Sequence, residues 1–157
     1  MASRGVPDRW LCDVMLARLA RLLRAAGHDA ALAGSEHPDR QLILQAEEEG
    51  RLLLTRDRQL AASVGAGAFL VTPDRPDDQA RLLGESFGVN WLAAPFTRCL
   101  MDNTMLRPAR AEEFAALPPD LPGPVNTCPA CSRLYWPGSH VRRMQRRLEI
   151  LAGQDSR

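Results

Sequence analysis

The chain has 157 residues, of which 45% are hydrophobic, 25% charged and 5% aromatic, a composition typical of a globular protein with a buried core. Arg18, Arg21 and Arg24 interrupt the most apolar stretch, which excludes the ~20 uncharged apolar residues that a membrane-spanning helix needs. Residues 1–13 carry no apolar segment of signal-peptide length, so we expect a cytoplasmic protein without membrane attachment. Four cysteines are too few for a disulfide scaffold and favour a metal site in a reducing compartment.

The formal net charge is only +1, and all 20 basic residues are arginines. They are enriched at both ends of the chain, around an acidic middle that spans residues 28–89. One interpretation of the absence of lysine is GC-rich codon usage, given the many Ala, Gly and Pro residues. The functional alternative is that the planar guanidinium group of arginine binds phosphate in a bidentate manner. The charge pattern indicates a local phosphate-binding patch at most.

Short apolar runs alternate with segments of helical periodicity over the first 88 residues. The apolar runs predict four buried strands, at residues 9–13, 28–33, 52–55 and 68–72. Helices are predicted at residues 15–26, 38–50 and 60–64, and in the segment that carries Leu82, Leu83 and Phe87. This alternation predicts an α/β fold with a mostly parallel sheet flanked by helices. We therefore expect residues 1–88 to form the main domain.

The composition changes after Gly88. Prolines become frequent, and three of the four cysteines lie in this part of the chain. A loop-rich segment of this kind needs a disulfide or a bound metal ion to be stable. We therefore expect residues 89–157 to form a second, small module. A basic helix at residues 140–151 is expected to close it.

Acidic residues follow the predicted strands. The carboxyl ends of the strands in an open α/β sheet meet at one edge, so we expect Asp13, Asp39 and Asp57 to lie near one another. Several carboxylates together favour Mg²⁺ or Mn²⁺, and such sites hydrolyse phosphodiesters. Each aspartate also has a structural alternative, since Asp is a favoured helix cap and Asp57 has Arg56 and Arg58 as possible ion-pair partners.

Three segments together carry a family resemblance: residues 10–27 (WLCDVMLARLARLLRAAG), 51–58 (RLLLTRDR) and 128–140 (CPACSRLYWPGSH). They resemble the PIN-like RNase family named for the C-terminal domain of the mut-seven exonuclease, over about residues 9–144. The resemblance implies a PIN-like nuclease domain followed by a zinc ribbon, acting on RNA with a divalent metal.

The same resemblance implies roles for individual residues. Asp13 and Asp57 correspond to the metal-binding acids of the family. Asp39 corresponds to the third acidic residue, and Glu36 is the alternative candidate for that position. The fourth acidic position of such a site stays open.

The cysteine pattern predicts a metal site with one substituted ligand. Cys128 and Cys131 form a CxxC pair, whose turn brings two thiolates to one zinc ion. Cys99 supplies half of a second pair, and Asp102 stands where the resemblance calls for its second cysteine. A carboxylate is an accepted zinc ligand, so these four residues can form a tetrahedral site, with His140 as the alternative fourth ligand.

Two other interpretations of these cysteines stay open. The module can be held by apolar packing without zinc, or the CxxC pair can be redox-active. Cys12 lies in a predicted buried strand and is expected to be a small core residue.

Arginines and aromatic residues suggest where RNA is held. Arg18, Arg21 and Arg24 recur every three residues, so we expect them on one face of the first helix, opposite its leucines. This face is either simply solvated, or its Arg18 and Arg21 hold phosphates near the metal site. Tyr135 and Trp136 offer stacking faces, which favours single-stranded RNA, although such aromatics also form the core of small modules. Basic residues of the last helix that we expect to contact RNA are Arg142 and Arg143.

The sequence therefore predicts a metal-dependent ribonuclease with RNA as its partner, Mg²⁺ or Mn²⁺ at the aspartates and structural zinc at the cysteines. The main alternative is a non-catalytic RNA-binding or adaptor protein that retains the fold. A toxin-type ribonuclease paired with an antitoxin and a redox protein are further alternatives.

Overall fold

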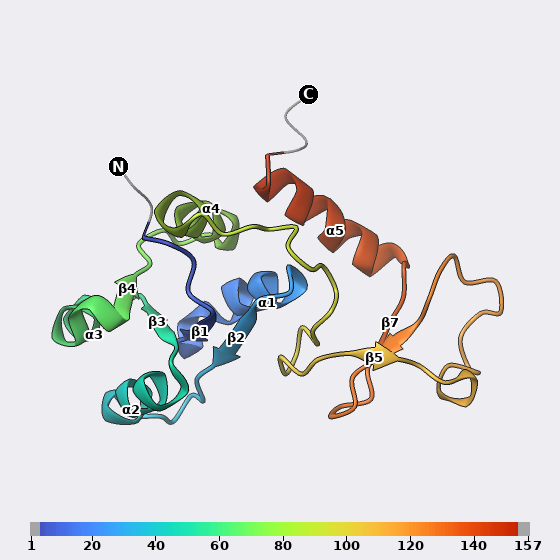
Figure 1. Cartoon of the computed structure of the whole chain (residues 1–157), viewed down its shortest axis with the longest axis horizontal. Helices are drawn as coiled ribbons and strands as arrows, with labels where there is room; N and C mark the ends of the chain where they lie inside the picture. The colour runs from blue at the N-terminus through green and yellow to red at the C-terminus, as the bar shows by residue number, and fades with distance from the viewer. Residues whose placement is uncertain (1–3, 154–157) are drawn as a thin grey trace.

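A computed structural model describes residues 4–153 and places a parallel four-stranded sheet at the centre of the main domain (Figure 1). The strands are β1 (Arg9–Cys12), β2 (Asp29–Leu32), β3 (Leu52–Thr55) and β4 (Ala68–Leu70), in the spatial order β2-β1-β3-β4. In the parallel register, Leu11 of β1 lies opposite both Ala31 of β2 and Leu53 of β3. The predicted parallel α/β sheet is confirmed, with every strand within two residues of its expected bounds.

Alternate residues of the central strands face opposite sides of the sheet. Trp10 and Cys12 of β1 pack into one hydrophobic core with Leu54 of β3, whereas Leu11 and Leu53 pack into a second core. All five side chains are fully buried. Cys12 is a core residue as expected, and its burial raises the pKa of the thiol to about 12.

Helices cover both faces of this sheet (Figure 1). Over the Trp10 core lie α1 (Ala17–Ala25) and α4 (Pro76–Phe87). Over the Leu11 core lie α2 (Asp39–Glu49) and α3 (Arg58–Val64). The helix predicted at residues 15–26 is divided, because a 3-10 turn, η1 (Val14–Leu16), precedes α1. A second 3-10 turn, η2 (Gly65–Gly67), leads into β4.

The chain beyond residue 88 first packs against the end of α1. The backbone N–H groups of Ala94 and Phe96 donate hydrogen bonds to the carbonyl oxygens of Ala26 and Ala25, both at 2.9 Å. Gly27 follows with a φ of 98°, and a Cβ atom there would lie 2.4 Å from the Ala94 carbonyl oxygen. Glycine is required at this position by the backbone conformation and by the close approach of residue 94.

A small antiparallel sheet and a long helix complete the fold. The sheet has the order β5-β6-β7, with β5 (Arg107–Pro108), β6 (Asn126–Thr127) and β7 (Leu134–Tyr135). A 3-10 turn, η3 (Ala111–Glu113), lies between β5 and β6, and α5 (Ser139–Leu151) confirms the basic helix predicted at residues 140–151.

Helix α5 returns to the core of the main domain, where it packs on α1 and α4. Leu148 is fully buried in the same cluster as Leu19 of α1 and Leu83 of α4. Arg147 forms an ion pair with Asp77 of α4, with Nη2 2.6 Å from Oδ1. The domain boundary after residue 88 stays a prediction, since the last helix completes the core of the first segment.

No helix within residues 4–153 combines the length and apolar character that crossing a membrane requires.

Candidate functional site

Asp13 and Asp57 lie at the same edge of the parallel sheet. Asp13 directly follows β1, and Asp57 comes two residues after the adjacent strand β3. The Oδ1 atom of Asp13 accepts a hydrogen bond from the backbone N–H of Val14 at 2.8 Å. The Oδ1 atom of Asp57 accepts two, from the N–H groups of Gln59 and Leu60, at 2.9 and 3.1 Å. Both aspartates therefore cap the helical turns that follow them.

Thr55 connects the two aspartates and is absent from the residues predicted for the site. Its hydroxyl donates to Oδ2 of Asp13 at 2.8 Å and accepts a hydrogen bond from the backbone N–H of Asp57 at 3.0 Å. The residue is fully buried, so these bonds satisfy a polar group whose burial would otherwise be unfavourable. The available signal was a single polar residue at the end of the apolar strand LLLT.

Asp39 is exposed and occupies the first position of α2. Its helix follows β2, which pairs with β1 on the side away from β3, so the three aspartates follow three neighbouring strands. The cap position belongs to Pro38, and no side chain caps this helix start. The capping alternative for Asp39 is therefore wrong, although its charge interacts favourably with the helix dipole.

The three aspartates do not form a compact ligand group. Within residues 4–153, one group of at least three His, Cys, Asp or Glu side chains has its ligand atoms within 4.8 Å of one another, and it is the cysteine group described next. Arg56, an alternative partner for Asp57, pairs instead with Asp74 at 2.6 Å. Joint metal binding by Asp13, Asp39 and Asp57 stays a prediction.

The cysteine group is built from two turns of similar backbone conformation. In the first turn, the N–H of Cys99 donates to the carbonyl of Thr104 at 2.8 Å, and the N–H of Asn103 donates to the carbonyl of Cys99 at 2.9 Å. Asn103 has a φ of 73°, a conformation that asparagine tolerates better than most residues. This turn presents Cys99 and, three residues later, Asp102.

The second turn repeats this pattern. The N–H of Cys128 donates to the carbonyl of Arg133 at 3.0 Å, and the N–H of Ser132 donates to the carbonyl of Cys128 at 2.8 Å. Ser132 has a φ of 65°, which matches the role of Asn103. The turn presents Cys128 and, three residues later, Cys131.

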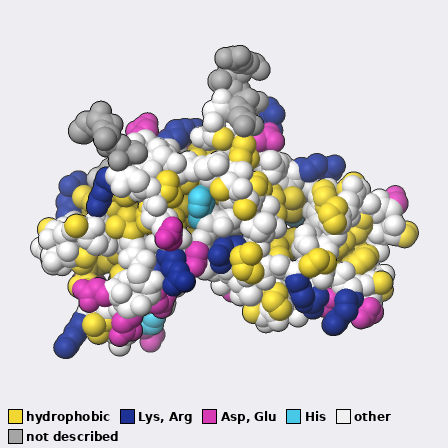
Figure 2. Space-filling model, in the orientation of Figure 1, with side chains coloured by type: hydrophobic (Ala, Val, Ile, Leu, Met, Phe, Trp, Pro, Cys, Tyr) yellow, Lys and Arg dark blue, Asp and Glu magenta, His cyan; other side chains and the backbone are white. Residues whose placement is uncertain are grey.

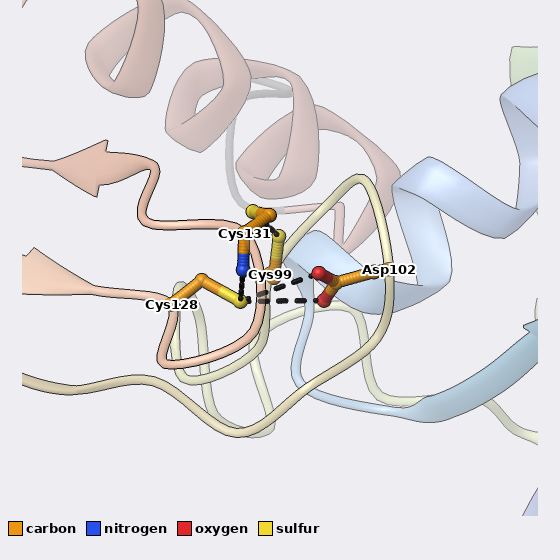
Figure 3. A group of neighbouring side chains, drawn as sticks. All are labelled: Cys99, Asp102, Cys128 and Cys131. Atoms are coloured by element: carbon orange, nitrogen blue, oxygen red, sulfur yellow. Dashed lines mark hydrogen bonds between the residues drawn. The ribbon is translucent and has the colours of Figure 1, made fainter.

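The four side chains point toward one another from these two turns (Figure 3). The Sγ atoms of Cys99 and Cys131 are 3.7 Å apart, and the Sγ atom of Cys128 lies 3.3 and 3.4 Å from the two carboxylate oxygens of Asp102. Cys99 and Cys128 are buried, whereas Asp102 and Cys131 are exposed. This group could hold a metal ion, and it contains Asp102 rather than the alternative ligand His140.

Hydrogen bonding favours a negative charge on Asp102 but not on Cys131. Partial desolvation acts to raise the pKa of the Asp102 carboxyl, but hydrogen bonds from Thr104, Cys128 and Cys99 hold that pKa well below its usual range. At Cys131 a backbone hydrogen bond with Arg133 lowers the thiol pKa, while desolvation and the Cys128 and Cys99 thiols raise it to about 11. A cation at this position would displace the thiol protons, because metals bind cysteine as thiolate.

The first turn is fixed to β2 through Asn103. The Nδ2 group of Asn103 donates to Oδ1 of Asp29 at 2.7 Å, and its Oδ1 atom accepts from the N–H of Ala30 at 3.1 Å. Asp29 also accepts a hydrogen bond from Nη1 of Arg51 at 2.7 Å. The candidate metal group is therefore connected to an edge strand of the main sheet.

The prediction that Arg24 shares one exposed helix face with Arg18 and Arg21 is wrong. Arg24 is only 4% exposed, so it does not share a solvated face with Arg18 and Arg21, both of which are exposed. Its Nε group donates to the carbonyl of Ala30 at 2.8 Å and its Nη1 group to the carbonyl of Leu100 at 3.1 Å. The guanidinium group is buried because two carbonyl oxygens, one of them next to Cys99, replace its contacts with water.

Tyr135 supports the cysteine group from β7. Its hydroxyl oxygen accepts a hydrogen bond from the N–H of Leu100 at 3.0 Å and lies 3.2 Å from Sγ of Cys99. Because the oxygen already accepts one hydrogen bond, its own proton is available to the sulfur, an arrangement that orients a metal ligand. Burial, together with Cys99, raises the pKa of Tyr135 above its usual range.

Three predicted RNA-binding residues, Arg21, Tyr135 and Trp136, line one groove of about 690 Å³. The other three, Arg18, Arg142 and Arg143, are exposed and lie outside its lining. On the face of the molecule drawn in Figure 2, arginine side chains are spread over both halves rather than gathered in one large patch. The structure thus brings together half of the predicted RNA contacts.

Fold and site together define an α/β protein whose parallel sheet has aspartates along one edge and whose cysteine-rich group is a candidate metal centre. Residues 8–148 match the Mut7-C RNAse domain family. The chain belongs to this family, which confirms the resemblance carried by its sequence segments.

A human relative is the exonuclease mut-7 homolog from Homo sapiens, which is 37% identical over 97 residues. The match covers 58% of this chain but only 11% of that relative, so the chain corresponds to about a tenth of its length. No solved structure matches the chain.

Proposed function

We propose that the chain is a metal-dependent ribonuclease of PIN-like fold, which hydrolyses RNA phosphodiester bonds at the sheet edge that carries Asp13, Asp39 and Asp57. The names of the family and of the human relative both denote nucleases. The observation that carries the proposal is the Thr55 hydroxyl, which links Asp13 to the backbone of Asp57 across two adjacent strands. Such a link holds two carboxylates at the edge where open α/β sheets bind ligands.

The chemistry of the donors fits a hard divalent cation. Asp13 and Asp57 offer carboxylate oxygens, and the exposed Asp39 begins the helix that follows the neighbouring strand β2. Both capping bonds of Asp57 go to Oδ1, which leaves Oδ2 for a cation. Mg²⁺ or Mn²⁺ held here would polarise the phosphate and lower the pKa of a water molecule.

Hydrogen bonds within the protein orient the Asp13 and Asp57 carboxylates. Thr55 fixes the direction of Asp13 through Oδ2, and the backbone N–H groups at the start of α3 fix Asp57. Arg18, exposed near the start of α1, is the residue that we propose to bind a phosphate next to the scissile one.

We also propose zinc for the cysteine group, where a ribbon-like module would carry it as a structural ion. Tetrahedral zinc with ~2.3 Å bonds to sulfur and ~2.0 Å bonds to oxygen requires sulfur–sulfur spacings of ~3.8 Å and sulfur–oxygen spacings of ~3.5 Å. The spacing from Cys99 to Cys131 is 3.7 Å, and those from Cys128 to Asp102 are 3.3 and 3.4 Å. These spacings match those of tetrahedral zinc, and all four ligand atoms lie within 4.8 Å of one another, which supports zinc as the ion.

The test of the ribonuclease is cleavage of end-labelled single-stranded and duplex RNA in Mg²⁺, Mn²⁺ or EDTA, using zinc-loaded protein. We expect cleavage only with an added divalent ion, and no cleavage by folded Asp13→Asn or Asp57→Asn variants. Asp120→Asn is the matched control, since Asp120 is an exposed loop aspartate. Equal cleavage by wild type and both variants would exclude the aspartates as the site.

The second candidate function is a non-catalytic RNA-binding protein, and one observation favours it. Asp13 and Asp57 already cap helical turns, and the aspartates form no compact ligand group. Metal-independent RNA binding with no cleavage in any ion would support this candidate over the ribonuclease.

A further inference from the structure

We propose that the groove lined by Arg21, Tyr135 and Trp136 binds an unpaired base of single-stranded RNA, an inference that rests on the proposed ribonuclease function. The groove lies where α1 faces β7, the start of α5 and the first turn of the cysteine group. It is therefore a site separate from the aspartate edge, which is formed by the ends of β1 and β3.

The lining has the character of a stacking site. Tyr135 and Trp136 contribute rings that are partly exposed, and aliphatic or aromatic walls come from Phe96, Leu100 and Met144. Unpaired bases bind proteins by stacking their flat faces on aromatic rings, whereas bases in a duplex are not available for such contacts. The lining thus favours a single strand over a double helix.

The charge of the lining favours a polyanion over an apolar protein segment. Arg21 and Arg133 are exposed members of the lining, His140 is a third basic residue, and no Asp or Glu belongs to it. A base held against Trp136 has phosphates on both sides of it, and arginines at the rim of the groove are suited to bind them.

Helix α1 connects the groove to the aspartate edge. Arg21 lies four residues, ~6 Å along the helix axis, beyond Ala17, which is the first residue of α1. Asp13 caps the turn that precedes this helix, and the exposed Arg18 lies three residues before Arg21 on the same side. RNA with a base in the groove would therefore extend along Arg18 toward Asp13.

The experiment follows the fluorescence of Trp136 in the zinc-loaded full chain, without Mg²⁺ or Mn²⁺ so that cleavage does not contribute. The chain has three tryptophans, and Trp10 and Trp91 are buried, so a ligand in the groove reports through Trp136. The probes are a short oligouridylate and an abasic strand of the same length and charge. We expect fluorescence quenching and about tenfold tighter binding for the strand that carries bases.

Variants assign this binding to the groove. Trp136→Ala should abolish quenching and weaken binding about tenfold or more, whereas Trp136→Phe keeps a stacking ring and should retain most of the affinity. Arg21→Gln should lower the slope of log affinity against log salt by about 0.7, the value for one phosphate contact. Arg81→Gln on α4, outside the groove lining, should leave binding unchanged.

Several results would overturn the proposal. These are equal affinity for the abasic strand, equal affinity for duplex RNA, or a Trp136 signal that changes with protein concentration alone, which would assign the groove to a second copy of the chain. If Trp136→Ala does not fold, the affinities of the wild-type protein for the oligouridylate and for the abasic strand still test whether the groove binds a base.

The two proposals fail separately. Base-dependent quenching in a protein that never cleaves RNA supports the groove and rejects the ribonuclease. Cleavage by a protein that binds abasic and normal strands equally rejects the groove and leaves the ribonuclease standing.

Discussion

Asp102 and Cys131 occupy equivalent positions in two turns of similar conformation, each three residues after a buried cysteine. In each turn the next residue, Asn103 or Ser132, has a left-handed backbone. A carboxylate can therefore replace a thiolate without a change in the turn, because the turn alone determines where the side chain begins.

Substitution of Asp102 tests this equivalence. We expect Asp102→Ala to lose one metal ligand and to weaken zinc binding by more than the ~10–100-fold effect of removing a second-shell partner. Asp102→Cys should restore binding, because it returns the thiolate that suits this turn. Zinc affinity is measured by competition with a chromophoric chelator, and unchanged affinity in Asp102→Ala would show that the carboxylate is no ligand.

Thr55→Val keeps the shape of the side chain and removes the hydroxyl that joins Asp13 to Asp57. We expect RNA cleavage to fall about tenfold or more, since small displacements of catalytic groups have large effects on rate. The free energy of unfolding should fall by about 1–3 kcal/mol, because a buried hydrogen-bonding partner is lost. Thr55→Ser should recover cleavage, and failure of serine to do so would count against a role for the hydroxyl.

We expect the contact between β2 and the cysteine group to weaken in acid, because it depends on the Asp29 carboxylate. Burial acts to raise its pKa, but hydrogen bonds from Arg51 and Asn103 lower it below the usual value. A carboxylate whose pKa is lowered by folding contributes stability above its unfolded pKa of ~3.9, and that stability is lost as the pH falls through the folded pKa.

We therefore expect the free energy of unfolding, measured by urea titration, to decrease as the pH is lowered below about 4. Asp29→Asn removes the titrating group and should flatten this part of the profile while lowering stability at neutral pH. The same acid dependence in Asp29→Asn and wild type would assign it to other carboxylates.

Leu148→Ala should destabilise the main domain although the residue lies in the last helix. Leu148 is fully buried with residues of α1 and α4, and truncation of such a leucine costs about 2–5 kcal/mol. Exposed Ile150 on the same helix is the matched control, and Ile150→Ala should change stability by much less. Equal effects of the two substitutions would mean that α5 is not part of the core.

The sequence predicted the sheet and its edge well because both depend on local patterns. LLLT and RWLC are short apolar strands, and an aspartate after each of them is visible in the sequence. The spacing of three residues also paired Cys128 with Cys131 in one turn, and the family resemblance placed Asp102 three residues after Cys99.

Contacts between distant segments could not be predicted in this way. Arg24 has helical periodicity with Arg18 and Arg21, yet it is buried because the carbonyl of Leu100, 76 residues later, accepts its hydrogen bond. Thr55 reaches Asp13 across 42 residues. Neither pairing has a sequence signal, because the partners meet only when α1 packs against the cysteine turn and β1 pairs with β3.

The burial of Leu148 also affects how the chain folds during synthesis. Every strand of the parallel sheet, and the four helices that cover it, lie within the first 87 residues. The face of α1 and α4 that Leu148 covers stays open to solvent until α5 has emerged from the ribosome, about 60 residues later at ~5–20 residues per second. For those several seconds, the nascent chain exposes the apolar surface that Leu148 covers in the folded protein.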